Sequence, residues 1–146
     1  MSDYRTPVAE MLFSLSHGAE AHRLSAWDAE LATELLTQAG RFIDGEVAPL
    51  DQFADSTPPQ VVDSRVKLDK RFFTSYHQYQ QAGWPSLSAP EAVGGQAQPE
   101  VLATAVSEML SGACISFQML LSLGQGAIRT LQAHATDQQK ADYLPR

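Results

Sequence analysis

The chain has 146 residues, enough for one domain with a sizeable hydrophobic core, and 44% of them are apolar, as in a soluble globular protein. Its formal net charge of −7 argues against nucleic-acid binding, because contacts to phosphates need a basic patch, and disfavours binding to a membrane surface for the same reason.

Two features of the sequence indicate a cytoplasmic protein. The N-terminus has no basic segment followed by an apolar one, so no secretory signal is expected. The chain has one cysteine, Cys114, so no disulfide can form within it. Because Cys114 stands in an apolar stretch without basic neighbours, we interpret it as a buried structural thiol.

Two helices are expected in the first third of the chain. Residues 7–15 repeat apolar side chains at helical spacing, with a proline in the first turn, where its missing N–H costs nothing. Residues 25–47 form the clearest amphipathic pattern. A weak capping box of Ser25 and Asp28 is expected to begin this second helix, and Pro49 to stop it.

The middle of the chain alternates between loop and helix. Residues 51–64 are polar and contain paired prolines, which predicts a surface loop. Residues 70–81 carry four aromatic side chains on adjoining faces and predict a third helix. Residues 82–98 are rich in Gly, Pro and Ala and predict a structured turn region without strands.

Residues 99–131 predict two helices with a break near residues 111–112. The stretch 113–123 is apolar on nearly every side, a pattern typical of a buried helix, and it is too short to span a bilayer. Thr136 and Gln139 form a capping box for a last helix, which Pro145 closes. The prediction is an all-α fold of about six helices, packed as an orthogonal or up-and-down bundle around a buried central helix.

No chemical motif identifies an activity from the residues alone. Gly124 and Gly126 lack the third glycine of a dinucleotide fingerprint, where Arg129 stands, and they lie within a helix instead of following a strand. No nucleophile, base and acid can be grouped by spacing. None of the four histidines stands at metal-ligand spacing, so no metal site is expected: His17, His22, His77 and His134.

One turn nevertheless resembles a known family. The stretch 82–96, AGWPSLSAPEAVGGQ, resembles the turn signature of acyl-CoA dehydrogenases. The segment before it resembles the helix that precedes that turn, and residues 107–146 resemble the two helices and the closing QK and YLP segment of the amino-terminal helical domain. Residues 4–15 resemble the N-terminal extension of a subgroup that includes 3-methylmercaptopropionyl-CoA and long-chain acyl-CoA dehydrogenases. Ala97 and Ala135 depart from the family, which usually has glycine at these positions.

The resemblance implies that residues 1–146 are the N-terminal helical domain of an FAD-dependent acyl-CoA dehydrogenase. Such an enzyme catalyses α,β-dehydrogenation of an acyl-CoA thioester. The family's middle β-domain, with most of the flavin site, and its C-terminal bundle, with the catalytic glutamate, are absent from this sequence. No catalytic residue is therefore expected in this chain, which alone should be inactive, and its flavin-binding residues stay unknown. The partners implied are acyl-CoA, the remainder of the enzyme, further copies in a dimer or tetramer, and an electron-transfer flavoprotein.

The resemblance also implies which residues line the acyl-chain pocket. Family pocket positions fall on Met119, Ser122, Leu123 and Gly126, whose spacing puts them on one helical face. Plain core packing gives the same pattern, so that alternative stays open. At the level of the whole chain, two alternatives remain: a non-catalytic helical interaction module, and a truncated subunit that borrows flavin and base from a partner.

Overall fold

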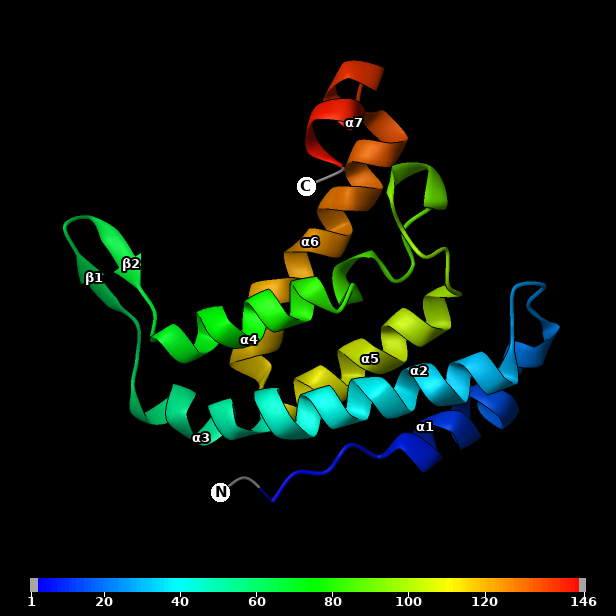
Figure 1. Cartoon of the computed structure of the whole chain (residues 1–146), viewed down its shortest axis with the longest axis horizontal. Helices are drawn as coiled ribbons and strands as arrows, with labels where there is room; N and C mark the ends of the chain where they lie inside the picture. The colour runs from blue at the N-terminus through cyan, green and yellow to red at the C-terminus, as the bar shows by residue number, and fades with distance from the viewer. Residues whose placement is uncertain (1–2, 145–146) are drawn as a thin grey trace.

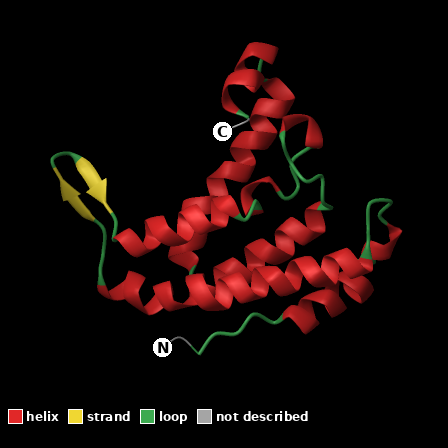
Figure 2. Ribbon diagram, viewed as in Figure 1, coloured by secondary structure: helices red, strands yellow, loops and turns green. Residues whose placement is uncertain are grey.

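The computed structural model describes residues 3–144, which are mainly helical with one small sheet (Figures 1 and 2). The predicted all-α class is confirmed. The prediction of a loop over residues 51–64 is wrong for most of its length. This segment holds the end of a helix that runs to Ser56 and the strand β1 (Gln60–Val62), which pairs with β2 (Arg65–Lys67) in a two-stranded antiparallel hairpin. The α-helices are α1 (Val8–Phe13), α2 (Ala29–Phe42), α3 (Ala48–Ser56), α4 (Lys70–Gln81), α5 (Glu100–Ala113), α6 (Ile115–His134) and α7 (Asp137–Tyr143).

The helices form a long base from which α6 rises (Figure 1). Helices α2 and α3 follow one another along this base, with α1 beside α2. Helix α5 packs against both α2 and α6. The hairpin projects at one end of the base, and the far end of α6 carries α7 (Figure 1). Within the described residues, no helix is long and apolar enough to cross a membrane.

The buried central helix is α5, which corrects the prediction that stretch 113–123 holds this place. Side chains of α5 that are buried include Leu102, Met109 and Leu110. In α6 only Phe117 is buried among the described residues, where its ring meets the edge of Tyr79 at a centroid separation of 6.4 Å. Several other apolar side chains of α6 are exposed, among them Met119, Leu120 and Leu123, so the apolar pattern of the sequence was correct and the inference of burial was not.

Three helix boundaries differ in detail from the prediction. Asp28 alone caps α2, because its carboxylate accepts hydrogen bonds of 2.9 Å from the backbone N–H groups of Glu30 and Leu31, and Ser25 takes no part. Pro49 does not end a helix; it lies in the first turn of α3, after a π-helical turn over Ile43–Val47. The predicted break between the last long helices falls at Cys114, which adopts an extended backbone.

Two predicted elements are confirmed closely. Helix α4 covers the residues expected of it, and Asp69 caps its first turn through the backbone N–H of Arg71. Helix α7 begins with the predicted capping box, in which Thr136 and Gln139 exchange side-chain and backbone hydrogen bonds. The proposed end of this helix at Pro145 lies outside the described residues.

The N-terminal segment lies across α2 and α5 as a strap. The Tyr4 hydroxyl donates a hydrogen bond of 3.0 Å to the carbonyl oxygen of Met109. The Thr6 backbone N–H donates one of 2.9 Å to the carboxylate of Asp44. Gly112 leaves room for this strap, since a Cβ atom there would lie 2.9 Å from the Tyr4 ring. The strap therefore connects the start of the chain to its central helix.

Candidate functional site

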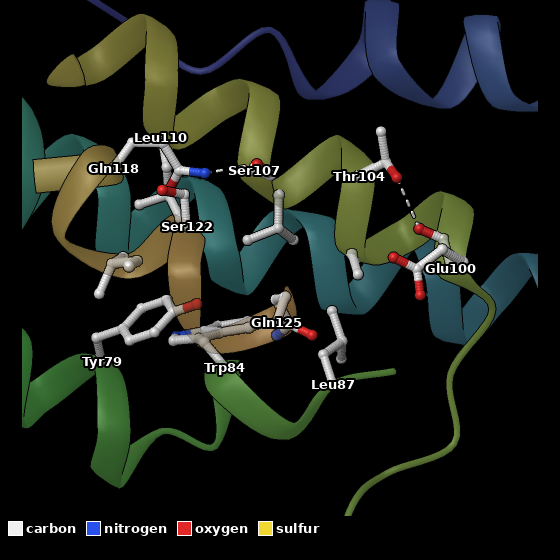
Figure 3. Close-up of a pocket in the computed structure, with 13 residues that line it drawn as sticks. Tyr79, Trp84, Leu87, Glu100, Thr104, Ser107, Leu110, Gln118, Ser122 and Gln125 are labelled. Atoms are coloured by element: carbon white, nitrogen blue, oxygen red, sulfur yellow. Dashed lines mark hydrogen bonds between the residues drawn. The ribbon is translucent and has the colours of Figure 1, made fainter. Parts of the chain in front are cut away.

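A cleft of about 190 Å³ opens between α5, α6 and the turn that follows α4, and we call it the α5–α6 cleft (Figure 3). Tyr79, Trp84 and Leu87 form one wall, and side chains of α5 face them from the other (Figure 3). The cleft is smaller than the ~300–1,000 Å³ of a pocket for a whole drug-sized ligand, so it suits one end of a ligand. Its further lining residues are Glu100, Ala103, Thr104, Val106, Ser107, Leu110, Gln118, Leu121, Ser122 and Gln125.

The turn wall is fixed by unusual backbone geometry. Gly83 has a φ of +79°, a conformation that favours glycine, and its carbonyl oxygen accepts a 2.8 Å hydrogen bond from the Gln96 side chain. Gly95 packs so closely that a Cβ atom would lie 1.9 Å from the carbonyl oxygen of Ala89. Ala97 also has a positive φ, of 50°, at a position where the resemblance noted in the sequence implies glycine. This folded turn holds Trp84 at the mouth of the cleft.

The helical wall is held by side-chain hydrogen bonds between α5 and α6. The Gln118 amide nitrogen donates to the hydroxyl oxygen of Ser107 at 2.6 Å. The guanidinium of Arg129 pairs with the carboxylate of Glu100, the one charged residue that lines the cleft. Both partners of this ion pair are more than half exposed, so it contributes little to stability.

Two polar atoms of lining residues have no hydrogen-bond partner. They are the indole nitrogen Nε1 of Trp84, which can only donate, and the amide oxygen Oε1 of Gln118, which can only accept. Both are covered by protein atoms. Nearby, burial raises the pKa of Tyr79 to about 12, with the neighbouring Tyr76 as a smaller cause, so this phenol stays neutral at physiological pH. The cleft therefore offers neutral polar groups on largely apolar walls.

The four predicted pocket residues lie on α6, but they do not line one cavity. Ser122 lines the α5–α6 cleft. Met119 lines a second, more apolar cleft of about 320 Å³, between α6, the start of α4 and the segment that follows α3. Leu123 is 80% exposed, and Gly126 is exposed with open space where a Cβ atom would stand. We call the side of α6 that carries Met119, Leu123 and Gly126 its outward face; among the described residues nothing covers it at Leu123 and Gly126.

Sequence reasoning missed the two lining residues with unpartnered atoms. Trp84 stood inside the turn motif, but the motif gave no reason to place it at a cleft. Gln118 was one of the few polar residues that interrupt an apolar helix, and that interruption was the available signal. Cys114, in contrast, is buried as expected, and burial raises the pKa of its thiol, which fits a structural role.

Within the described part of the chain, the two clefts above are lined by no lysine or arginine. A diphosphate requires basic side chains or backbone N–H groups at a helix N-terminus. The charged side chains that line these two clefts are those of Glu100 and Asp69, which repel phosphate. Residues 3–144 also contain no group of three or more His, Cys, Asp and Glu side chains that could hold a metal ion.

Comparison with known proteins decides the family. A family model for the N-terminal domain of acyl-CoA dehydrogenases matches residues 29–146. The chain belongs to the acyl-CoA dehydrogenase family. It is 32% identical over 149 residues to 3-methylmercaptopropionyl-CoA dehydrogenase from Ruegeria pomeroyi, with 98% of this chain and 25% of the relative aligned. It is 29% identical over 153 residues to the broad-specificity linear acyl-CoA dehydrogenase FadE5 from Mycobacterium tuberculosis, with 96% of this chain and 24% of the relative aligned. This member of the family therefore spans about a quarter of the length of these curated relatives.

Proposed function

We propose that the chain is the N-terminal helical part of an FAD-dependent acyl-CoA dehydrogenase and that α6 forms one wall of the acyl-chain site. The observation that carries this proposal is the outward apolar face of α6 in a member of this family. Met119 and Leu123 are 68% and 80% exposed on that face. Large exposed apolar surfaces mark sites where a partner or ligand binds.

The reaction proposed is α,β-dehydrogenation of an acyl-CoA thioester. Flavin and catalytic base are assigned to parts of the enzyme outside this chain, as the resemblance to the family implies, and the absence of lysine and arginine from the two clefts supports this for the flavin diphosphate. The contribution of α6 is to orient the acyl chain and to exclude water from it, both of which are means of catalysis through positioning. The names of the two relatives suggest 3-methylmercaptopropionyl-CoA and linear acyl-CoA thioesters as candidate substrates. An oligomeric enzyme that passes electrons to an electron-transfer flavoprotein belongs to the same proposal.

A substitution on α6 tests the assignment of the wall. Phenylalanine at Gly126 should fill the acyl-chain site, because its side chain meets open space on the outward face. In the intact enzyme, Gly126→Phe should lower kcat/KM for medium-chain thioesters by about tenfold or more relative to short ones. The assay uses mass spectrometry to measure the loss of two hydrogen atoms from the thioester.

Gly124→Phe is the matched control. Gly124 also has open space at the Cβ position, but it lines a cleft between α4 and α6 on another side of the helix. This variant should keep the wild-type ratio between chain lengths. An unchanged ratio in Gly126→Phe contradicts the role of α6 as the wall. Absence of dehydrogenation of every thioester by the wild type contradicts the proposed reaction and leaves an interaction module as the function.

A further inference from the structure

The strap, residues 3–7, lies on the fold without joining a helix or a sheet. These residues, where the described chain begins, belong to no regular element and run along the base of the fold toward α1 (Figure 1). Asp3 and Arg5 are exposed, whereas Tyr4 and Thr6 between and after them are half-buried. This alternation is that of an extended peptide with one face against a surface. The strap therefore lies on α2 and α5 in the manner of a bound peptide.

Two glycines shape the surface that receives the strap. A Cβ atom at Gly40 on α2 would lie 2.7 Å from Oγ1 of Thr6, and a Cβ atom at Gly112 on α5 would lie 2.9 Å from the Tyr4 ring. Glycine is unfavourable within a helix, so two glycines under the strap indicate a surface adapted to it. Because the space comes from missing side chains on two helices that pack on each other, it persists when the strap leaves.

Polar groups beside both glycines recognise the strap. The carbonyl oxygen of Met109 accepts the 3.0 Å hydrogen bond from the Tyr4 hydroxyl. The carboxylate of Asp44, just after α2, accepts the 2.9 Å hydrogen bond from the Thr6 backbone N–H. The features recognised are thus a phenol and, two residues later, a backbone N–H. We call the surface defined by Gly40, Asp44, Met109 and Gly112 the strap site.

The strap lies outside the buried core. Among the described residues the core of buried side chains begins at Leu15, and Tyr4 and Val8 are only partly buried against it. Helices α2 and α5 contact each other directly, without the strap between them. The two helices that form the strap site therefore have their own packing, and the strap is added to their surface.

We propose that the strap site is a peptide-binding site whose ligand, the chain's own N-terminal segment, binds reversibly and can be supplied by a separate molecule. The ligand is an extended peptide with a tyrosine and, two residues later, a backbone N–H that donates to Asp44. In the intact chain the site is occupied by its own strap, because attachment to α1 gives the strap a high effective concentration. None of residues 3–8 lines the two clefts described above, so this binding is independent of the proposed function.

The test supplies the strap as a free peptide. A fluorescent peptide with the sequence of residues 1–7 is titrated, with anisotropy as the readout, into a variant of the intact protein that begins at Val8. Saturable binding of one peptide per chain is expected. Binding to the full-length protein should be weaker by about tenfold or more, because its own strap fills the site. A Tyr4→Phe peptide should bind about fivefold more weakly, because it lacks the hydroxyl that donates to Met109.

Gly112→Leu and Gly124→Leu, each made in the protein that begins at Val8, are the matched pair. Leucine favours a helix more than glycine does, so neither change should unfold its helix. The side chain at position 112 would take the place of the Tyr4 ring and should weaken peptide binding by about tenfold or more. At position 124 it meets open space and should leave peptide binding unchanged.

Failure of the peptide to bind overturns the proposal. Equal binding to the shortened and the full-length protein also overturns it, as do equal effects of the two leucine variants, because the peptide then binds elsewhere. If the shortened protein loses its helical circular dichroism, the same titration is followed as refolding. Recovery of the helical signal with the peptide supports a separable ligand, and no recovery overturns the proposal.

Discussion

The side-chain amide of Gln125 donates a hydrogen bond of 2.7 Å to the carbonyl oxygen of Pro85, which stands 40 positions earlier in the chain. This contact fastens α6 to the turn that carries Trp84. Gln125→Leu should lower the free energy of unfolding by about 1 kcal/mol, because it leaves a partly buried carbonyl oxygen without its donor. Urea denaturation followed by circular dichroism measures the change.

The control for that prediction is Gln138→Leu. Gln138 donates to Asp142 at 3.0 Å within one turn of the exposed helix α7, so its loss should cost less than ~0.5 kcal/mol. Equal losses in the two variants would mean that the contact between α6 and the turn adds nothing beyond an ordinary surface interaction.

The turn itself should not tolerate a side chain at Gly95. A Cβ atom there would lie 1.9 Å from the carbonyl oxygen of Ala89, and backbone cannot move aside cheaply. Gly95→Ala should therefore destabilise the fold by more than ~2 kcal/mol, measured by thermal or urea unfolding. Gly18→Ala meets nothing within 4 Å and serves as the comparison. Similar unfolding midpoints for both variants would show that the turn rearranges freely.

Stability should fall in strong alkali because of Tyr79. Burial raises the pKa of its phenol from 10.0 to about 12 in the folded chain. Between these values the unfolded chain has lost the proton that the folded chain keeps, so the unfolded state is favoured as the pH rises. The contribution of the neutral Tyr79 phenol to the free energy of unfolding is fully present below pH 10 and is lost as the pH rises toward about 12. Tyr79→Phe should lose less stability than the wild type across this window, and equal slopes would contradict the prediction.

The 146-residue chain by itself should self-associate through the outward face of α6. Met119 and Leu123 are largely exposed there, and exposed apolar patches drive association. Sedimentation velocity should detect oligomers, and a dye specific for apolar surface should bind. Introducing glutamate at both positions should shift the chain to monomer, whereas Ala133→Glu, which adds charge elsewhere on α6, should not. A monomeric wild type without dye binding contradicts the prediction.

Elements whose signals are local could be predicted from the sequence. The four aromatic side chains of α4 and the Thr136 and Gln139 capping box lie within one or two helical turns, and the structure has both as expected. The cap of α2 was placed three residues too early, because Ser25 and Asp28 both have side chains suited to capping and the backbone decides between them.

Two features had signals that the sequence could not resolve. The hairpin turns through Asp63 and Ser64, both with positive φ, and neither residue is the glycine that normally marks such a turn. In α6, apolar residues on every side predicted burial, but the sequence does not say whether the cover comes from these residues or from elsewhere. The α5–α6 cleft was beyond prediction because Trp84 and Gln118 come to line it only through the packing of separate elements.

The strap at the N-terminus has a consequence for the order of events during synthesis. Tyr4 is among the first residues made, but its hydrogen-bond acceptor, Met109, lies 105 positions later. At ribosomal rates of about 5–20 residues per second, Tyr4 waits for about 5–20 s before Met109 is even polymerised. Until then α1 and α2 have no α5 to pack on. The apolar face of α2 is thus exposed in the nascent chain, and a chaperone that shields it would act in this interval.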